Sequence, residues 1–427
     1  MPAPAVLSAT PGFFGWRVVS AAFVVAMFGW GVSFYGPPIF LHTLQAERGW
    51  PVGLVSAAIT CHFLVGAAIV ANLAGLYRRF GLVAVTRAAA LATALGCLGW
   101  ALAAQPWQLF AATLLSGFGW AGTGGAAINA MVSPWFDRRR PAALSTAYNG
   151  ASIGGVLLSP LWVLLIGRFG FAGAMTLVGG AMVLVLWCLA GPILGRSPEA
   201  MGQAPDGALP GTAAPRPAAP PPGGSLWRDG RFLTLAGATS LGLFAQIGLI
   251  AHLFSLLVPT LGAELAGVAA GLATACAILG RTALGWLLPP GADRRRAAAA
   301  NYLLQCCGSL VLLAAGGVSV PLLLAGVVLF GLGLGNATSL LPLMAQQDFA
   351  PAEAGRVVAL ITACSQAAYA FAPAAFGLLR EAGAPWGGPA GAPALFLAAA
   401  LAQLLAAGVL LGGRRPQAVI QPPSRSA

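Results

Sequence analysis

Lysine is missing from this sequence of 427 residues, and charge of either sign is scarce. Only 7% of the residues are charged, 58% are hydrophobic, and the mean hydropathy is +0.84. A soluble protein of this size would need a larger charged surface, so the composition excludes that class and indicates a membrane protein. The absence of lysine also excludes the phosphate-binding loop of nucleotide hydrolases, because that motif requires one.

Catalytic and metal-binding patterns are missing as well. There is no buried carboxylate pair, no serine with a histidine and an aspartate in a plausible array, and no metal-ligand cluster. The seven cysteines lie scattered in apolar segments without metal or disulfide spacing, which is typical of small packing residues. We therefore expect neither an enzyme nor a bound cofactor.

Long apolar runs fill most of the chain. A membrane-spanning helix takes roughly 20 apolar residues, and runs bounded by charge, proline or glycine predict about twelve spans. The first six lie near 15–41, 51–77, 82–104, 107–132, 141–165 and 170–194. The second six lie near 231–259, 265–288, 297–316, 321–345, 355–379 and 392–412.

A polar stretch divides these spans into two sets. Proline recurs there among alanine and glycine, from Pro205 to the run Pro220–Pro222, and such a composition predicts a disordered linker. The expected fold is an all-α membrane protein of two pseudo-symmetric six-helix bundles. Its parts are an N-terminal bundle (15–194), a Pro/Ala-rich linker (195–230), a C-terminal bundle (231–412) and a tail (413–427).

The two bundles repeat one sequence pattern. Phe136, Ser152 and Pro160 recur at a constant offset of 213 residues as Phe349, Ser365 and Pro373. Duplicated six-helix halves are typical of transporters that expose a midplane site alternately to the two sides of the membrane. The repeat therefore favours a transporter that works as a monomer.

Arginine is distributed unevenly along the chain. With the N-terminus in the cytoplasm, 18 of the 22 arginines fall on the cytoplasmic side, whereas Arg48, Arg168 and Arg380 fall on the other and Arg281 lies within a span. This bias predicts that both termini and the linker are cytoplasmic, in a multi-pass protein of a bacterial inner membrane. The net charge of +12 then reflects topology and not nucleic-acid binding, because the arginines stand at helix ends.

Three segments carry a family pattern: the Gly15 to Val19 start of the first span, the stretch Phe136 to Ala143 with Gly150 and Gly154, and Gly280 to Gly285 in the eighth span. They resemble the major facilitator superfamily, and within it the monocarboxylate transporter and oxalate/formate antiporter group. The resemblance covers both halves and implies the twelve-helix fold and alternating access, as a symporter or an antiporter.

The general superfamily motif after the second span is degraded here. Residues 74–81 place Arg78 where that superfamily usually has an aspartate, so the conformational lock of this motif is altered. By resemblance, the gating and loop positions are Arg78, Arg79, Gly81, Arg139 and Arg140.

Arg281 is the leading candidate for substrate binding. A charge at the bilayer centre costs about 2.5 to 3.5 kcal/mol on insertion scales, so an arginine within a span indicates a functional role. Its permanently charged fork matches the geometry of a carboxylate, and the family resemblance implies the same role for the arginine of the eighth-span motif. The alternative is that the long side chain reaches the headgroup region from about two turns inside its helix.

Proton coupling has few candidates in this sequence. None of the ten acidic residues lies deep in a span, and Ala277 stands one turn before Arg281, where the resembling group often has an aspartate. The titratable residues that remain are His62 and His252, each of which could equally be a packing residue. Exchange of one anion for another, or facilitated diffusion, requires no titratable group.

A wider polar set could line the cavity between the bundles. Its members stand near mid-span in helices that face the cavity in this fold: Tyr35, Asn149, Gln246, Asn336, Gln366 and Tyr369. Buried amides also bond neighbouring helices without touching any substrate. Trp30 and Trp120, likewise near mid-span, could contact an apolar substrate or pack in the core.

Three functions fit these features. The favoured one is a carrier of a small organic anion, such as a monocarboxylate, with Arg281 binding the carboxylate and with a co-transported proton or an exchanged anion. An efflux transporter of apolar compounds would also suit the scarcity of buried charge. A membrane sensor without transport activity is disfavoured, because the linker and tails offer no soluble output domain.

Overall fold

The computed structural model describes residues 12–207, 225–289, 292–383 and 393–413, and within these ranges it is built of helices and turns. The helices are α1 (Gly15–Ser33), α2 (Pro37–Arg48), α3 (Val52–Leu102), α4 (Pro106–Thr123), α5 (Gly125–Val132), α6 (Arg140–Leu189), α7 (Gly230–Leu287), α8 (Arg294–Ala314), α9 (Val320–Leu334), α10 (Asn336–Asp348), α11 (Pro351–Ala370), α12 (Ala372–Gly383) and α13 (Pro393–Gly412).

Three of these helices are long enough for two spans each. α3, α6 and α7 contain Gly81, Gly170 and Gly262, whose φ angles of 80°, 70° and 74° are left-handed. Glycine adopts this conformation readily because it has no Cβ. The chain reverses at Gly81, since His62 before it and Trp100 after it both hydrogen bond to Ser116. Each of the three glycines therefore marks a turn between two consecutive spans.

These turns reconcile the observed helices with the predicted spans. By length and composition, seven helical segments could cross a membrane, or eight if α9 and α10 form one bent span. Three of the seven hold two predicted spans each, and α4 with α5 supplies the span predicted at 107–132. The described residues are thus consistent with twelve spans.

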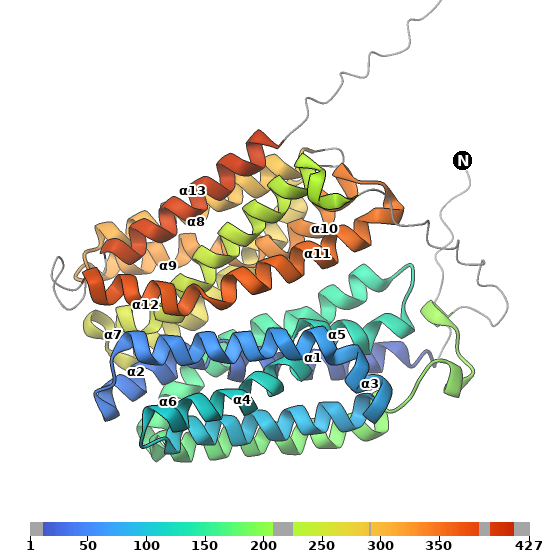
Figure 1. The fold of residues 1–427 in the computed structure, drawn as a ribbon, viewed down its shortest axis with the longest axis horizontal. Coiled ribbons are helices and arrows are strands. Elements are labelled where there is room, and N and C mark those ends of the chain that lie inside the picture. The colour runs from blue at the N-terminus through green and yellow to red at the C-terminus, as the bar shows by residue number, and fades with distance from the viewer. Residues whose placement is uncertain (1–11, 208–224, 290–291, 384–392, 414–427) are drawn as a thin grey trace, which may run out of the picture.

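The helices lie roughly along one axis in two halves, one coloured blue to green and the other yellow-green to red in Figure 1. We call the end where α1 begins at Gly15 and α13 ends at Gly412 the terminal end. The other end, where α2 ends at Arg48 and α12 ends at Gly383, is the distal end. The two halves meet along α6 and α7, among other contacts.

Glycines bring α6 and α7 together at a contact that we call the seam, formed by Gly155, Gly267 and Gly271. A Cβ at Gly155 would lie 2.7 Å from the Tyr35 ring and 2.6 Å from the Thr274 methyl group. A Cβ at Gly267 would lie 2.8 Å from Val163, and one at Gly271 would lie 3.1 Å from the Val156 carbonyl oxygen. Small residues of this kind let helix backbones approach closely in a bilayer.

Gly150 packs α6 against α1 within the N-terminal half. A Cβ on Gly150 would overlap the Phe23 carbonyl oxygen, whereas a Cβ on Gly167 of the same helix would meet nothing within 4 Å. We expect Gly150→Ala to lower the apparent Tm of the detergent-solubilised protein, because overpacking costs about 1–3 kcal/mol. Gly167→Ala should leave the Tm unchanged or raise it, since alanine is the better helix former. Equal melting temperatures for the two variants would contradict the close α1–α6 contact.

The first part of the linker is folded, which differs from the predicted disorder. The Asp206 carboxylate accepts the backbone N–H groups of Asp137, Arg138 and Arg139 at 3.2, 2.7 and 3.2 Å. The Gln203 side chain accepts the Phe14 N–H at 3.0 Å. These bonds fix short helical turns at Glu199–Met201 and Pro205–Gly207 to the N-terminal half, which composition alone cannot reveal. The remaining prolines of the linker, from Pro210 to Pro222, lie outside the described residues.

A buried ion pair joins three helices at the terminal end of the C-terminal half. The Arg295 guanidinium on α8 contacts the Asp348 carboxylate at the end of α10 through Nε at 2.6 Å. Its other nitrogens donate to Thr234 Oγ1 at 3.0 Å and to the Arg231 carbonyl oxygen at 2.8 Å on α7. Nearby, hydrogen bonds from Arg231 hold the pKa of Asp229 below its usual range. One arginine thus ties the ends of α7, α8 and α10 together.

Candidate functional site

A cavity of about 340 Å³ opens at the terminal end between the halves. It is lined by Ser145 of α6, Arg281, Leu284 and Gly285 of α7, Leu288 just after α7, Arg294 of α8, and Asn336, Ser339, Leu340 and Leu343 of α10. Two arginines and several hydroxyl or amide groups therefore face a largely apolar wall. No metal-binding group of histidine, cysteine or acidic side chains occurs in the part of the chain that the structure describes.

Arg281 reaches across this cavity from the C-terminal half to the N-terminal half. Its Nη1 donates to Asn149 Oδ1 at 3.2 Å, while its buried Nε has no hydrogen-bond partner. All ten acidic residues are described, and none forms an ion pair with Arg281. The guanidinium thus keeps donors free, which is the arrangement that an anion would complete.

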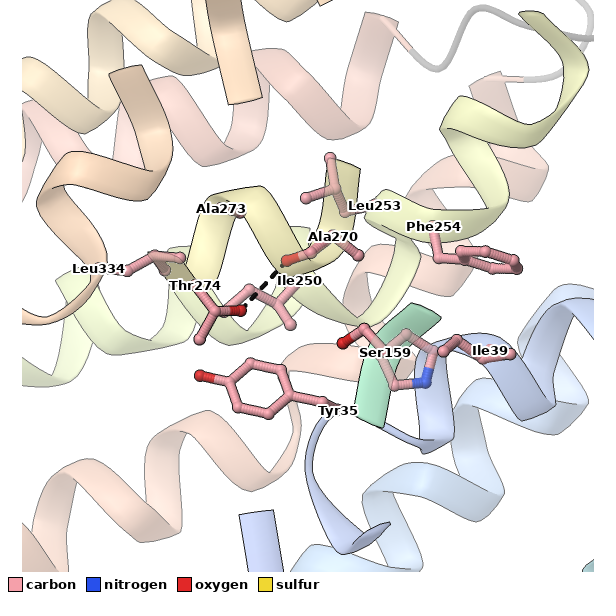
Figure 2. Close-up of a pocket in the computed structure, with 11 residues that line it drawn as sticks. Tyr35, Ile39, Ser159, Ile250, Leu253, Phe254, Ala270, Ala273, Thr274 and Leu334 are labelled. Atoms are coloured by element: carbon pink, nitrogen blue, oxygen red, sulfur yellow. Dashed lines mark hydrogen bonds between the residues drawn. The ribbon is translucent and has the colours of Figure 1, made fainter. Parts of the chain in front are cut away.

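A layer of packed side chains closes the inner end of the cavity. Tyr35, in the link between α1 and α2, and Thr274 of α7 lie next to each other in Figure 2, with Ile250 beside them. The dashed line marks the bond from the Thr274 hydroxyl to the Ala270 carbonyl oxygen at 3.1 Å. These residues line a space of only about 20 Å³. A Cβ on Gly155 would contact both Tyr35 and Thr274, and Thr274 stands about two turns before Arg281 on α7. Tyr35 therefore stands between the cavity and the distal end.

The distal end is closed by contacts between α3 and α12. Glu381 accepts the Gly53 N–H at 2.6 Å, and the Ala374 N–H donates to Thr60 Oγ1 at 3.1 Å. Between these bonds, a Cβ on Gly377 would lie 2.6 Å from Ser56 Oγ. With the terminal end open and the distal end closed, the structure shows one of the two access states expected of a carrier.

The structure brings four of the predicted binding residues together and separates the rest. Arg281 and Asn336 line the cavity, Asn149 is bonded to Arg281, and Tyr35 lines the small space of about 20 Å³. Asn336 donates to Asn301 Oδ1 at 2.8 Å, and its own Oδ1 is buried without a partner. The other three, Gln246, Gln366 and Tyr369, do not line the 340 Å³ cavity.

Those three residues lie in α7 and α11. Gln246 is buried with its Oε1 unpartnered, and Gln366 stands one turn before Tyr369 on α11. Tyr369 packs on Phe63 of the N-terminal half, with ring centroids 6.0 Å apart. Their contact with a substrate therefore stays a prediction that would require a change of conformation.

Both candidate histidines are held by hydrogen bonds inside a half. His62 contacts Ser116 Oγ at 2.9 Å and the Ser33 carbonyl oxygen at 3.1 Å, which occupies both ring nitrogens. His252 contacts the Pro373 carbonyl oxygen at 3.1 Å, and its Nδ1 has no partner. Neither residue lines the cavity around Arg281. A role for either in proton coupling remains a prediction.

The gating and loop residues lie at the terminal end. Gly81 forms the left-handed turn of α3, and the Arg79 guanidinium lies 5.1 Å from the centroid of the Phe80 ring beside it. Arg140 donates to the Phe136 carbonyl oxygen at 3.0 Å, which fixes the start of α6. Arg78 precedes the turn, and Arg139 belongs to the backbone segment that Asp206 caps.

An aromatic cluster occupies the centre of the N-terminal half. Trp30 and Trp120 have ring centroids 5.0 Å apart, and Trp30 also packs on Tyr148 at 6.1 Å. Phe34 stacks on Trp120 at 6.0 Å. Of these aromatic residues, the sequence predicted only the two tryptophans as candidates for core packing or substrate contact. Tyr148 could have been included as well, because it stands next to the candidate residue Asn149. The tryptophans pack with each other, which supports the core-packing interpretation.

Comparison of the sequence with family profiles identifies the family of this chain. The profile of the Major Facilitator Superfamily matches residues 18–373, which is most of the chain. Human monocarboxylate transporter 11 is 28% identical over 387 residues, a match that covers 86% of this chain and 70% of the human protein. Bovine monocarboxylate transporter 13 is 30% identical over 65% of this chain and 62% of its own length. The chain thus spans less than two thirds of the bovine relative.

Solved structures of transporters have the same fold. The nucleoside transporter NupG superposes with a TM-score of 0.69 at 12% identity, covering 94% of this chain and 98% of that one. An inward-facing bacterial homologue of the human lysosomal transporter Spinster gives 0.70 at 14% identity, covering 95% of this chain and 99% of that one. Similarity at this level of identity shows the fold alone. The sequence profile and the fold agree that this chain is a transporter, not an enzyme, and that it belongs to the Major Facilitator Superfamily.

Proposed function

We propose that the protein carries a small organic anion, a monocarboxylate, across the membrane by alternating access. The observation that carries this proposal is the Arg281 guanidinium, which faces the cavity between the halves with a buried Nε unpartnered and with no carboxylate paired to it. A buried charge without a counter-ion is costly, and an anionic substrate would supply one.

The chemistry around Arg281 favours a single carboxylate with a small body. The planar fork of arginine binds two carboxylate oxygens at once, which gives orientation as well as affinity. Asn149 already accepts one N–H of the fork, so a bound carboxylate would take that place or share it. The cavity of about 340 Å³ lies at the small end of the range for ligand sites, and its leucines would contact the apolar part.

Transport in this proposal is exchange of anions or facilitated diffusion, without a co-transported proton. None of the ten acidic residues lines the cavity, and His62 and His252 are bonded elsewhere. We also propose that the terminal end faces the cytoplasm of a bacterial inner membrane, with the arginine bias as support. A fluorescent or phosphatase reporter fused to the C-terminus tests this orientation, and a signal from the non-cytoplasmic side of the membrane would contradict it.

Uptake into liposomes that contain the purified protein tests the proposal. The probes are labelled acetate, L-lactate, pyruvate and benzoate, each matched with its uncharged amide. We expect at least one carboxylate to enter faster than into protein-free liposomes, with competition by the unlabelled acid but not by the amide. At clamped membrane potential, collapse of the pH gradient should leave the rate unchanged; a proportional loss would show proton coupling.

Two outcomes would overturn the anion assignment. Equal transport of the amides would indicate a carrier of neutral or apolar compounds. Specific binding of a carboxylate without any transport would indicate a sensor.

A further inference from the structure

Arg380 is a second arginine inside the C-terminal half that lacks a carboxylate partner. It lies in the last turn of α12, and its Nη1 donates to the buried Ser255 hydroxyl of α7 at 2.5 Å. Among the ten acidic residues, none pairs with it, and the neighbouring Glu381 directs its carboxylate to the Gly53 N–H. The residue is half-buried at the distal end, three residues before α12 ends at Gly383.

The surroundings of Arg380 are polar, and no carboxylate in the described part of the chain pairs with it. His252 of the same half contacts the Pro373 carbonyl oxygen of α12 at 3.1 Å, which places it between α7 and α12. A basic residue in the last turn of a helix is often explained by the negative helix end. In the described residues, however, the guanidinium bonds across to α7 and not to the carbonyl groups of α12. A half-buried guanidinium with a single hydroxyl partner has donors left for an anion.

Contacts between the two halves lie near this half-buried arginine in the present state and limit access to it. His42 of the N-terminal half packs edge-on against Phe254, with ring centroids 5.5 Å apart. Phe254 directly precedes Ser255, the partner of Arg380. The bond from Gly53 to Glu381 closes the other side. Separation of the halves at the distal end would therefore break these contacts and expose Arg380 to solutes on the distal side.

We propose that Arg380 is a carboxylate-binding residue of the distal-open state, used at the distal mouth before the anion reaches Arg281. This inference rests on the proposed function, because it assumes that the substrate is an organic anion. Ser255 orients the guanidinium, and the contacts between the halves at the distal end limit access to it while the terminal end is open. Arg380 would contribute to binding in one access state only, whereas Arg281 lies at the inner end of the cavity and would contribute in both.

Kinetics from the two faces distinguish these roles. Net flow of L-lactate and benzoate is measured from each face in vesicles of both orientations, at zero concentration on the opposite side. For Arg380→Gln we expect the KM from the distal face to rise about tenfold or more with kcat unchanged, the size expected for one lost charge-assisted bond. A passive carrier cannot pump, so kcat/KM must fall equally in the other direction. From the terminal face we therefore expect kcat to fall and KM to stay constant.

Matched variants complete the test. Arg168 also lies at the distal end but is exposed, so Arg168→Gln should change neither parameter. Arg380→Lys keeps the charge and should recover part of the distal affinity. Such a recovery would show that the effect of Arg380→Gln does not come from misfolding.

If wild-type protein transports no carboxylate, the proposed function and this inference both fail. If wild-type protein transports one and Arg380→Gln raises KM from both faces, or from neither, only the role of Arg380 is wrong.

Discussion

Replacement of Arg281 by alanine is expected to lower kcat/KM for the transported carboxylate at least about 100-fold, the equivalent of about 2.7 kcal/mol. The variant loses the guanidinium that faces the cavity, and only apolar and amide groups remain there. An anion that entered the cavity would lose its hydration water without gaining a charged partner in return. Initial rates of uptake into liposomes, measured over a range of substrate concentrations, give this ratio directly.

Two further variants show whether charge or shape causes the loss. Arg281→Lys keeps a positive charge but cannot form the two parallel bonds of a fork, so we expect intermediate transport. Arg168→Ala removes an exposed arginine outside the cavity and should leave the rate unchanged. Unchanged uptake of every transported carboxylate by Arg281→Ala would rule out the anion site.

Replacement of Arg295 by alanine is expected to have the largest effect on stability. The side chain is only 3% exposed and its partner Asp348 is 16% exposed, so the change leaves a nearly buried carboxylate without its counter-ion. Breaking a buried ion pair in this way costs about 3–5 kcal/mol. We expect the apparent Tm of the purified protein to fall on the order of 10 °C, as followed by a thiol-reactive dye during heating.

The neighbouring arginine provides the control. Arg296 is 69% exposed and stands 3.8 Å from Asp293, a surface pair that contributes about 0–1 kcal/mol. Arg296→Ala should therefore melt close to the wild-type temperature. The double variant Arg295→Met with Asp348→Leu should recover much of the stability, because no unpaired charge remains. A Tm for Arg295→Ala that matches Arg296→Ala would show that the buried pair does not hold α7, α8 and α10 together.

The positions of the spans could be predicted because each depends on local composition. Gly81 and Gly262 lie in the gaps between the apolar runs at 51–77 and 82–104 and at 231–259 and 265–288, and Gly170 is the first residue of the run at 170–194. Each of these glycines forms a left-handed turn in the structure. Apolar periodicity and a glycine at the boundary carry this information without any tertiary contact.

The candidate site could be predicted only in part, because it is formed by contacts between distant segments. Arg281 was recognisable as a charge within an apolar run, but its partner Asn149 is 132 positions away. His62 appeared as a titratable group near mid-span, and only the fold reveals Ser116 and the Ser33 carbonyl oxygen beside it. Arg380 stood at the predicted end of a span, where arginine is ordinary, so nothing in the sequence marked it as buried.

The seam of Gly155, Gly267 and Gly271 has a geometric consequence for the amplitude of the motion. It lies part-way along helices that span the bundle, and about ten residues at 1.5 Å each give a lever arm of roughly 15 Å from the seam to a helix end. A rigid rotation of about 15° around the seam would displace that end by about 4 Å. Such a displacement exceeds the reach of the bonds of Gly53 with Glu381 and of Ala374 with Thr60, which measure 2.6 and 3.1 Å. A small tilt of straight helices would therefore suffice to release the distal end.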